Sequence, residues 1–155
     1  MELSHLDEHG RAQMVDISAK SETRRLAVAE GFVRMQSTTV GIIERREVAK
    51  GDVFTVAKVA GILAAKSTAS LIPMCHPLLL TDVALELEAS PDGVHIRASV
   101  TTVGRTGAEM EALTAVSVTA LTVYDMCKAV DKTMVLGDIR LLRKEGGKSD
   151  FHADE

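Results

Sequence analysis

The stretch VALELEASPDGVHIRASV, residues 83–100, decides the fold. Apolar residues occupy every second position on both sides of Pro91-Asp92-Gly93: Val83, Leu85 and Leu87 before it, and Val94, Ile96, Ala98 and Val100 after it. Alternation with a period of two is typical of strands with one buried face, and Pro-Asp-Gly is typical of a turn. The stretch therefore predicts a β-hairpin.

The flanking sequence supplies the remaining elements. We expect a short helix over residues 22–29, a strand over 31–36, helical structure over 39–70, a long helix over 106–129 and a strand over 134–142. The helical region is interrupted near residues 50–51, where Asp52 can cap the second part. In that second part Val56, Val59, Ala60 and Leu63 share one face. Gly137 is a weak point or bulge in the last strand.

The order βαββαβ predicts an α+β, ferredoxin-like fold, in which a four-stranded antiparallel sheet carries helices on one face. The other face is then uncovered, which favours an oligomer interface unless that face is polar. Residues 1–155 are expected to form a single domain, with polar, flexible ends at about 1–10 and 146–155.

Composition and charge limit the classes of function. The net charge of −4 favours neither nucleic acid nor an anionic membrane. The two cysteines form no CxxC pair, which suits a reducing compartment. The polar start lacks the apolar core of a signal peptide, and the longest apolar run, 112–124, is too short to span a bilayer. We therefore expect a cytoplasmic protein.

A thiol and an imidazole, Cys75 and His76, lie between Pro73 and Pro77, which stiffen the backbone on both sides. This segment suits ligand binding or proton transfer as well as a rigid buried crossing with a hydrogen-bonded histidine. A metal site is disfavoured because no second Cys or His lies at ligand spacing. A cysteine nucleophile is equally disfavoured, since adjacency in sequence does not orient an imidazole toward a thiol.

Carboxylates occur at both ends of the long predicted helix. Thr106 and Glu109 have capping-box spacing, whereas Glu111 opens an apolar run and needs a partner or ligand. Asp125 and Lys128 share a helix face, either as an ordinary surface ion pair or as an acid/base pair at a partly desolvated helix end. Glu111 and Asp125 are 14 positions apart, about 21 Å along a helix. They can meet one substrate only if it is long or if two subunits contribute.

Cations at Arg24-Arg25, Lys50, Lys66, Lys128, Lys144 and Lys148 could together hold a polyphosphate if folding gathers them. A nucleotide-binding regulatory module would explain these cations but would leave Asp125 and Lys128 without a role. An RNA-binding module is weaker still, because the predicted strands lack aromatic residues for base stacking.

Several long motifs resemble the MoaC family of molybdenum cofactor biosynthesis. They are residues 14–20, 50–53, 60–62, 64–66, 72–78, 106–118, 124–129 and the closing 141–149. Departures are mild: Met74, Arg105 and Asp150 stand where Leu, Lys and Gly are usual. The resemblance implies a cyclic pyranopterin monophosphate synthase, a lyase that converts (8S)-3′,8-cyclo-7,8-dihydroguanosine 5′-triphosphate to cyclic pyranopterin monophosphate and pyrophosphate.

The resemblance also implies roles for individual residues. Asp125, Lys128 and Lys50 would be catalytic, with Asp125 as the acid/base. Substrate would be bound by Met74, Cys75, His76, Met110, Glu111, Glu109, Arg25, Lys66 and Lys144, of which Arg25, Lys66 and Lys144 would neutralise phosphates. No dedicated metal site or redox cofactor is expected, and Mg²⁺ bound through the triphosphate is left open. The implied assembly is a homohexamer, a trimer of dimers with active sites at a subunit interface.

Overall fold

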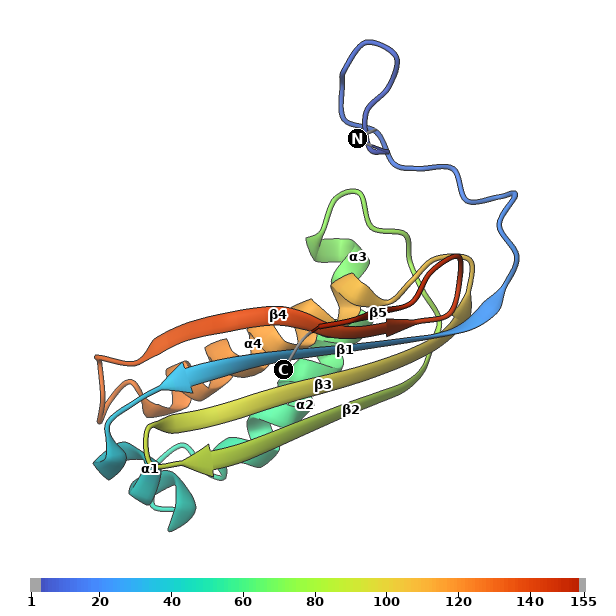
Figure 1. Cartoon of the computed structure of the whole chain (residues 1–155). Coiled ribbons are helices and arrows are strands. Elements are labelled where there is room, and N and C mark those ends of the chain that lie inside the picture. Colours follow the sequence, from blue (N-terminus) through green and yellow to red (C-terminus); the bar gives the residue numbers. More distant parts are fainter. Residues whose placement is uncertain (1–3, 154–155) are drawn as a thin grey trace.

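The computed structural model describes residues 4–153 and contains an open antiparallel sheet with helices packed against it (Figure 1). The elements in chain order are β1 (Thr23–Arg34), α1 (Ser37–Glu44), α2 (Val53–Lys66), α3 (Thr68–Leu71), β2 (Leu80–Ser90), β3 (Gly93–Gly104), α4 (Glu109–Cys127), β4 (Val135–Glu145) and β5 (Phe151–His152). The α+β class and the β2–β3 hairpin are therefore as predicted. Asp52 caps α2, accepting a hydrogen bond from the Thr55 amide.

The sheet has five strands in the order β2-β3-β1-β4-β5, so the predicted count of four is wrong. The additional strand is β5, which pairs Phe151 and His152 with Lys144 and Arg143 at the end of β4. No apolar alternation precedes it in the sequence. Its pairing depends on the turn after β4, where Gly146 donates its amide hydrogen to Asp150 Oδ1.

The helix predicted over residues 22–29 is wrong, because this segment is the first part of β1. Arg25, Ala27, Ala29 and Val33 alternate along the strand as buried residues. Alanine and leucine favour helices intrinsically. Burial at every second position nevertheless makes this segment a strand, with Ala27 and Ala29 on the face that packs against α4. Tertiary packing here overrides local propensity.

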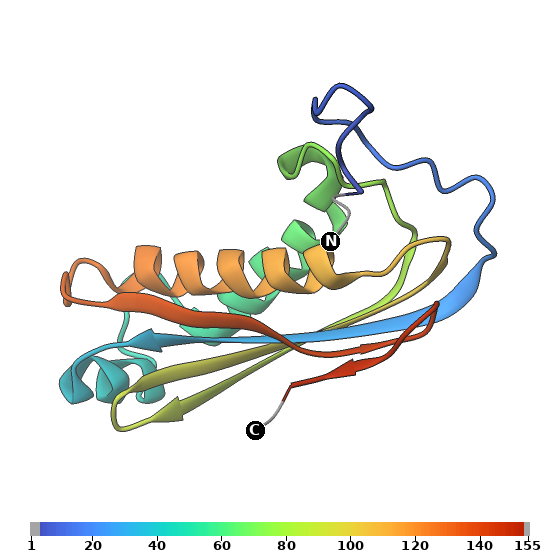
Figure 2. The same cartoon turned by 45° about the horizontal axis from the view of Figure 1, so that its top comes forward.

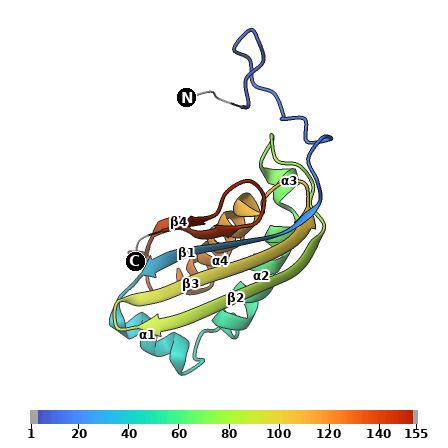
Figure 3. The same cartoon turned by 45° about the vertical axis from the view of Figure 1, so that its right-hand side comes forward.

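Helices α2 and α4 lie side by side on one face of the sheet (Figures 2 and 3). They approach closely at Gly61, where an added Cβ would collide with Thr119 Oγ1 and lie 3.2 Å from the Ala115 carbonyl oxygen. The side of α2 that packs consists of Val53, Ala57, Gly61, Ala64 and Ala65. The bulkier Val56, Val59 and Leu63 are exposed instead.

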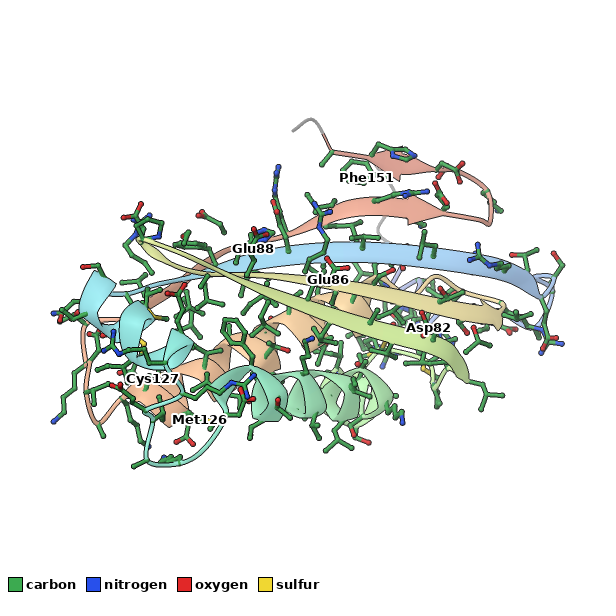
Figure 4. The ribbon with its side chains drawn as sticks, turned by 90° about the horizontal axis from the view of Figure 1, so that it is seen from below. Asp82, Glu86, Glu88, Met126, Cys127 and Phe151 are labelled. Carbon is green, nitrogen blue, oxygen red and sulfur yellow. The ribbon has the colours of Figure 1, made fainter. Side chains whose placement is uncertain are left out.

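The face of the sheet away from the helices is polar. On it Glu30 accepts hydrogen bonds from Arg140 Nε at 2.7 Å and pairs with His95 Nε2 at 2.8 Å. Glu86 and Glu88 lie on the same face of β2, opposite Met126 and Cys127 in the helix layer (Figure 4). A face with this many charged side chains is a poor candidate for a purely apolar subunit contact.

The bulge predicted near Gly137 is confirmed. The β1–β4 register shifts between Glu30 and Phe32, and Asp138 has a positive φ of 53°. Beyond this irregularity β4 continues to Glu145, which brings Lys144 to the opposite end of the sheet.

A buried carboxylate, Asp131, joins the turn after α4 to the start of α1. Asp131 Oδ2 accepts from the Gln36 amide and Thr39 Oγ1, while Oδ1 accepts from the amide and hydroxyl of Thr133. Burial alone would raise the pKa of Asp131, but these hydrogen bonds outweigh it and lower the pKa to about 2.

This lowered pKa makes the stabilisation by Asp131 depend on pH. It is present above the unfolded pKa of 3.8 and lost as the pH falls through about 2. We expect Asp131→Asn to lower the free energy of unfolding at pH 7 by about 1–3 kcal/mol, because two donors lose their acceptor. Urea unfolding should show this difference shrinking between pH 4 and pH 2. Asp82→Asn, on exposed β2, is the control, and a loss independent of pH would contradict the assignment.

Candidate active site

The predicted site residues form two groups at opposite ends of α4. Lys50, Asp125 and Lys128, called here the lysine–aspartate group, lie at its carboxyl end. Cys75, Glu109 and Glu111 lie at its amino end. The two groups are separated by about 21 Å at the helical rise of ~1.5 Å per residue.

Folding brings Lys50 to the end of α4 from the loop before α2. Its Nζ donates to the Asp125 carbonyl oxygen at 3.0 Å and lies 3.4 Å from Asp125 Oδ2. Lys128 Nζ is 2.9 Å from Asp125 Oδ1. Carbonyl groups in the last turn of a helix lack intrahelical partners and favour nearby cations, so Lys50 and Lys128 both suit this position.

The lysine–aspartate group is exposed, which matches the first of the two alternatives from the sequence, a surface ion pair, and not the second, a partly desolvated helix end. The side chains of Asp125 and Lys128 are 58% and 52% accessible. Hydrogen bonds from Lys128 and then Lys50 lower the pKa of Asp125, and the hydrogen bond to Asp125 raises the pKa of Lys128. Asp125 and Lys128 are therefore both charged at neutral pH in the single chain.

A cavity of about 460 Å³, called here the first pocket, lies at the other end of α4. It is lined by Ser4, His5, Val15, Ile17, Lys20, Ile72, Met74, Cys75, His76, Thr106, Gly107, Glu109 and Met110. Five predicted binding residues, Met74, Cys75, His76, Glu109 and Met110, are thus brought together. The pocket residues between 4 and 20 were not predicted. The family motif at residues 14–20 could have indicated that this segment contributes to the site.

Glu111 lies behind the first pocket and is almost completely buried. Its Oε1 is 3.7 Å from Cys75 Sγ, and its Oε2 has no hydrogen-bond partner within residues 4–153. Burial raises the pKa of Glu111, which favours the neutral acid. Burial is the main cause that raises the pKa of Cys75, and the charge of Glu111 is the second; together they raise it to about 11. Cys75 is consequently a thiol at neutral pH, which argues against a nucleophilic role.

The capping box expected for Thr106 and Glu109 does not form. Helix α4 begins with Ala108 as its N-cap, and no side chain caps it. Glu109 instead pairs with Lys144, whose Nζ is 2.6 Å from Glu109 Oε1. This pair connects the first pocket to the end of β4.

A second cavity of about 440 Å³ adjoins the first. It is lined by Ala19, Lys20, Ser21, Thr23, Arg25, Gly147 and Lys148, and Lys20 lines both cavities. Lys66 ends α2 on the same side of the molecule, near α3, but lines neither cavity.

Within residues 4–153, no three His, Cys, Asp or Glu side chains form a group that could hold a metal ion. Nor does any helix in that range have the length and apolar character needed to cross a membrane.

Fold and site together define a small α+β protein with an ion-paired lysine–aspartate group and a pocket bordered by cations. Residues 14–147 match the model of the MoaC family. The chain belongs to the MoaC family.

Relatives named cyclic pyranopterin monophosphate synthase are similar over nearly the whole chain. The relative from Desulfitobacterium hafniense is 61% identical, covering 96% of this chain and 92% of its own length. That from Roseiflexus sp. strain RS-1 is 57% identical over 99% of each chain. That from Thermoanaerobacter sp. strain X514 is 53% identical over 100% of this chain and 99% of its own.

The contact between Cys75 and Glu111 predicts a change in thiol reactivity. Replacing Glu111 with Gln removes a negative charge that raises the pKa of Cys75, so the thiolate fraction should increase. We expect iodoacetamide to modify Cys75 at pH 8.5 several-fold faster in Glu111→Gln than in the unmodified sequence. Peptide mass spectrometry measures the rate, and buried Cys127 in the same protein is the control. Equal rates at Cys75 would contradict the assigned contact.

Proposed function

We propose that this chain is a cyclic pyranopterin monophosphate synthase in molybdenum cofactor biosynthesis. Its substrate is then the cyclised dihydroguanosine triphosphate, and its products are cyclic pyranopterin monophosphate and pyrophosphate. The observation that carries the proposal is family membership over residues 14–147 together with the Lys50–Asp125–Lys128 geometry. A regulatory module would explain the cations but would leave Asp125 and Lys128 without a chemical role.

In this proposal Asp125 is the acid/base, Lys128 is its partner and Lys50 assists. General acid/base catalysis works best when the pKa of the catalytic group lies near the operating pH. The exposed pair does not satisfy this, since the pKa of Lys128 is raised by Asp125. Covering the group with substrate and a second subunit would desolvate the ammonium and lower its pKa. The activity therefore requires an assembled site.

The first pocket is proposed to hold the guanine-derived part of the substrate. Met74, Cys75, His76 and Met110 offer apolar and polar contacts, and Glu111 can donate a hydrogen bond to a ring nitrogen or carbonyl when it is protonated, the form that burial favours. The cations Arg25, Lys66 and Lys144 would neutralise phosphates, with Lys144 exchanging its contact with Glu109 for the ligand. Mg²⁺ carried by the triphosphate stays a prediction.

We further propose that each active site is shared between subunits of a homohexamer, a trimer of dimers. The distance of about 21 Å along α4 prevents one chain from closing both groups around a small ligand. The exposed apolar side chains Val56, Val59 and Leu63 on α2 and Leu121 on α4 support contact through the helix layer, since the free sheet face is polar. We also propose that β1 to β4 form a ferredoxin-like core and that the protein is cytoplasmic.

Removing either partner of the ion pair should abolish most activity. We expect Asp125→Asn and Lys128→Ala each to reduce kcat by about 100-fold or more, because a proton-transfer group is lost. Product formation and pyrophosphate release from the cyclic triphosphate are measured on protein of unchanged oligomeric state. Asp82→Asn and Lys58→Ala, both on exposed positions, are the matched controls. Near-normal turnover by both site variants would contradict the assigned roles.

Subunit mixing tests whether the site is shared. Lys50 and Asp125 belong to one group, so the informative pair combines Asp125→Asn with His76→Ala from the other end of α4. If each site takes one group from each subunit, a random dimeric mixture should recover about a quarter of the original activity. Mass spectrometry verifies exchange. No recovery after proven exchange would contradict sharing.

A further inference from the structure

A buried carboxylate lies just beyond the lysine–aspartate group. Asp131 follows Lys128 by three residues, in the connection between α4 and β4, and it is 3% exposed. Each of its carboxylate oxygens accepts two hydrogen bonds, one pair from within the connection and the other from the region where α1 begins. Because burying an ionised carboxylate is costly without such donors, this arrangement fixes the carboxylate in one position.

Backbone hydrogen bonds at the end of α4 connect Asp131 to Lys128. The Asp131 and Val130 amides both donate to the Cys127 carbonyl oxygen, at 3.1 and 3.0 Å. The Lys128 amide donates to the Tyr124 carbonyl oxygen at 2.8 Å. These hydrogen bonds overlap along the chain and close the last turn of the helix. The backbone position of Lys128 is therefore coupled to that of Asp131.

The side chain of Asp131 joins this turn to a different part of the fold. Its Oδ2 accepts from the Gln36 amide at 3.0 Å and from Thr39 Oγ1 at 2.9 Å. Gln36 is the N-cap of α1, and Thr39 is buried in the first turn of that helix. The partial positive charge at the start of a helix favours a carboxylate there. Asp131 thus joins the carboxyl end of α4 to the corner between β1 and α1, at one end of the molecule (Figure 2).

This anchor matters for the lysine–aspartate group because the ion pairs of that group are exposed. Asp125, Lys128 and Lys50 are bound to one another at the surface. Exposed ion pairs are weak and do not by themselves hold long side chains in one geometry. The alignment of the group must therefore come from the backbone that carries it. Lys50 also depends on the last turn of α4, since its Nζ donates to the Asp125 carbonyl oxygen.

We propose that Asp131 is a positioning residue for the lysine–aspartate group. By anchoring the last turn of α4 to the start of α1, it holds Asp125 and Lys128 in the alignment that proton transfer needs. Because it is buried, Asp131 acts through these two residues and not on the substrate. Its part in catalysis rests on the proposed function, whereas its effect on the ion pair does not.

The direct test is the pKa of the Asp125 carboxyl group in the assembled full-length protein, measured by carbon-13 NMR titration. Hydrogen bonds from Lys128 and then Lys50 hold this pKa below its ordinary value of 3.8. An asparagine side chain has one acceptor oxygen where aspartate has two, so Asp131→Asn should loosen the last turn and raise the Asp125 pKa toward 3.8. Loss of the negative charge alone would lower the Asp125 pKa, so the direction separates lost alignment from lost charge.

Two further variants complete this measurement. Thr39→Val removes one donor and keeps the charge of Asp131, so it should raise the Asp125 pKa by a smaller amount. Asp82→Asn, on exposed β2, should leave this pKa unchanged. An Asp125 pKa that falls or stays the same in Asp131→Asn would overturn the assignment. If Asp131→Asn does not fold, the same result in Thr39→Val overturns it.

Steady-state kinetics test the consequence for the proposed reaction. With the cyclic triphosphate as substrate, Asp131→Asn should lower kcat about tenfold and change KM little, because alignment is lost while the first pocket is intact. Rates are expressed per folded protein, so a loss of stability alone leaves kcat unchanged. An unchanged kcat despite a raised Asp125 pKa would overturn the role in catalysis. If the unmodified sequence forms no product but the pKa rises as expected, the anchor is supported and only the proposed function fails.

Discussion

The close approach of α2 and α4 at Gly61 is the constraint on which the site depends. With no side chain between them, the two helices pack through small residues, and the ends of one helix are aligned with the ends of the other. The start of α2 therefore brings Lys50 to Asp125 at the carboxyl end of α4. The segment after α2 brings Cys75 to Glu111 at the amino end.

This arrangement gives the two ends of α4 opposite environments. At one end, exposed lysines lower the pKa of Asp125 and keep it ionised. At the other end, burial raises the pKa values of Glu111 and Cys75 and favours their neutral forms. A substrate that needs both charge neutralisation and hydrogen-bond donation requires both ends, and the rigid helix keeps them apart within one chain. Assembly thereby becomes part of the proposed chemistry.

Patterns of period two predicted the β2–β3 hairpin, and the long apolar run predicted α4, because in both cases periodicity and propensity agree. They disagree in β1, where Ala27 and Ala29 favour a helix but are buried in alternation. Strand β5 could not be predicted from residues 151–152, since its pairing partner is set by the turn at Gly146.

For the site, the charged residues were identified from sequence, and their grouping depended on tertiary structure. The i,i+3 spacing predicted the Asp125–Lys128 pair, but nothing local indicated that Lys50 would join it. The same holds for Glu109, whose capping-box spacing was outweighed by Lys144 arriving from β4. Lys20 has no distinguishing local pattern beyond its motif, and only the fold brings it between the two cavities.

The most direct measurement is a crystal structure of Asp125→Asn with the cyclic triphosphate bound. The account predicts that the ligand contacts His76 and Arg25 of one subunit together with Lys50 and Lys128 of its partner, and that the lysine–aspartate group loses solvent in the contact. A ligand held entirely by one subunit, with Lys50 and Lys128 still exposed and remote from it, would contradict the account.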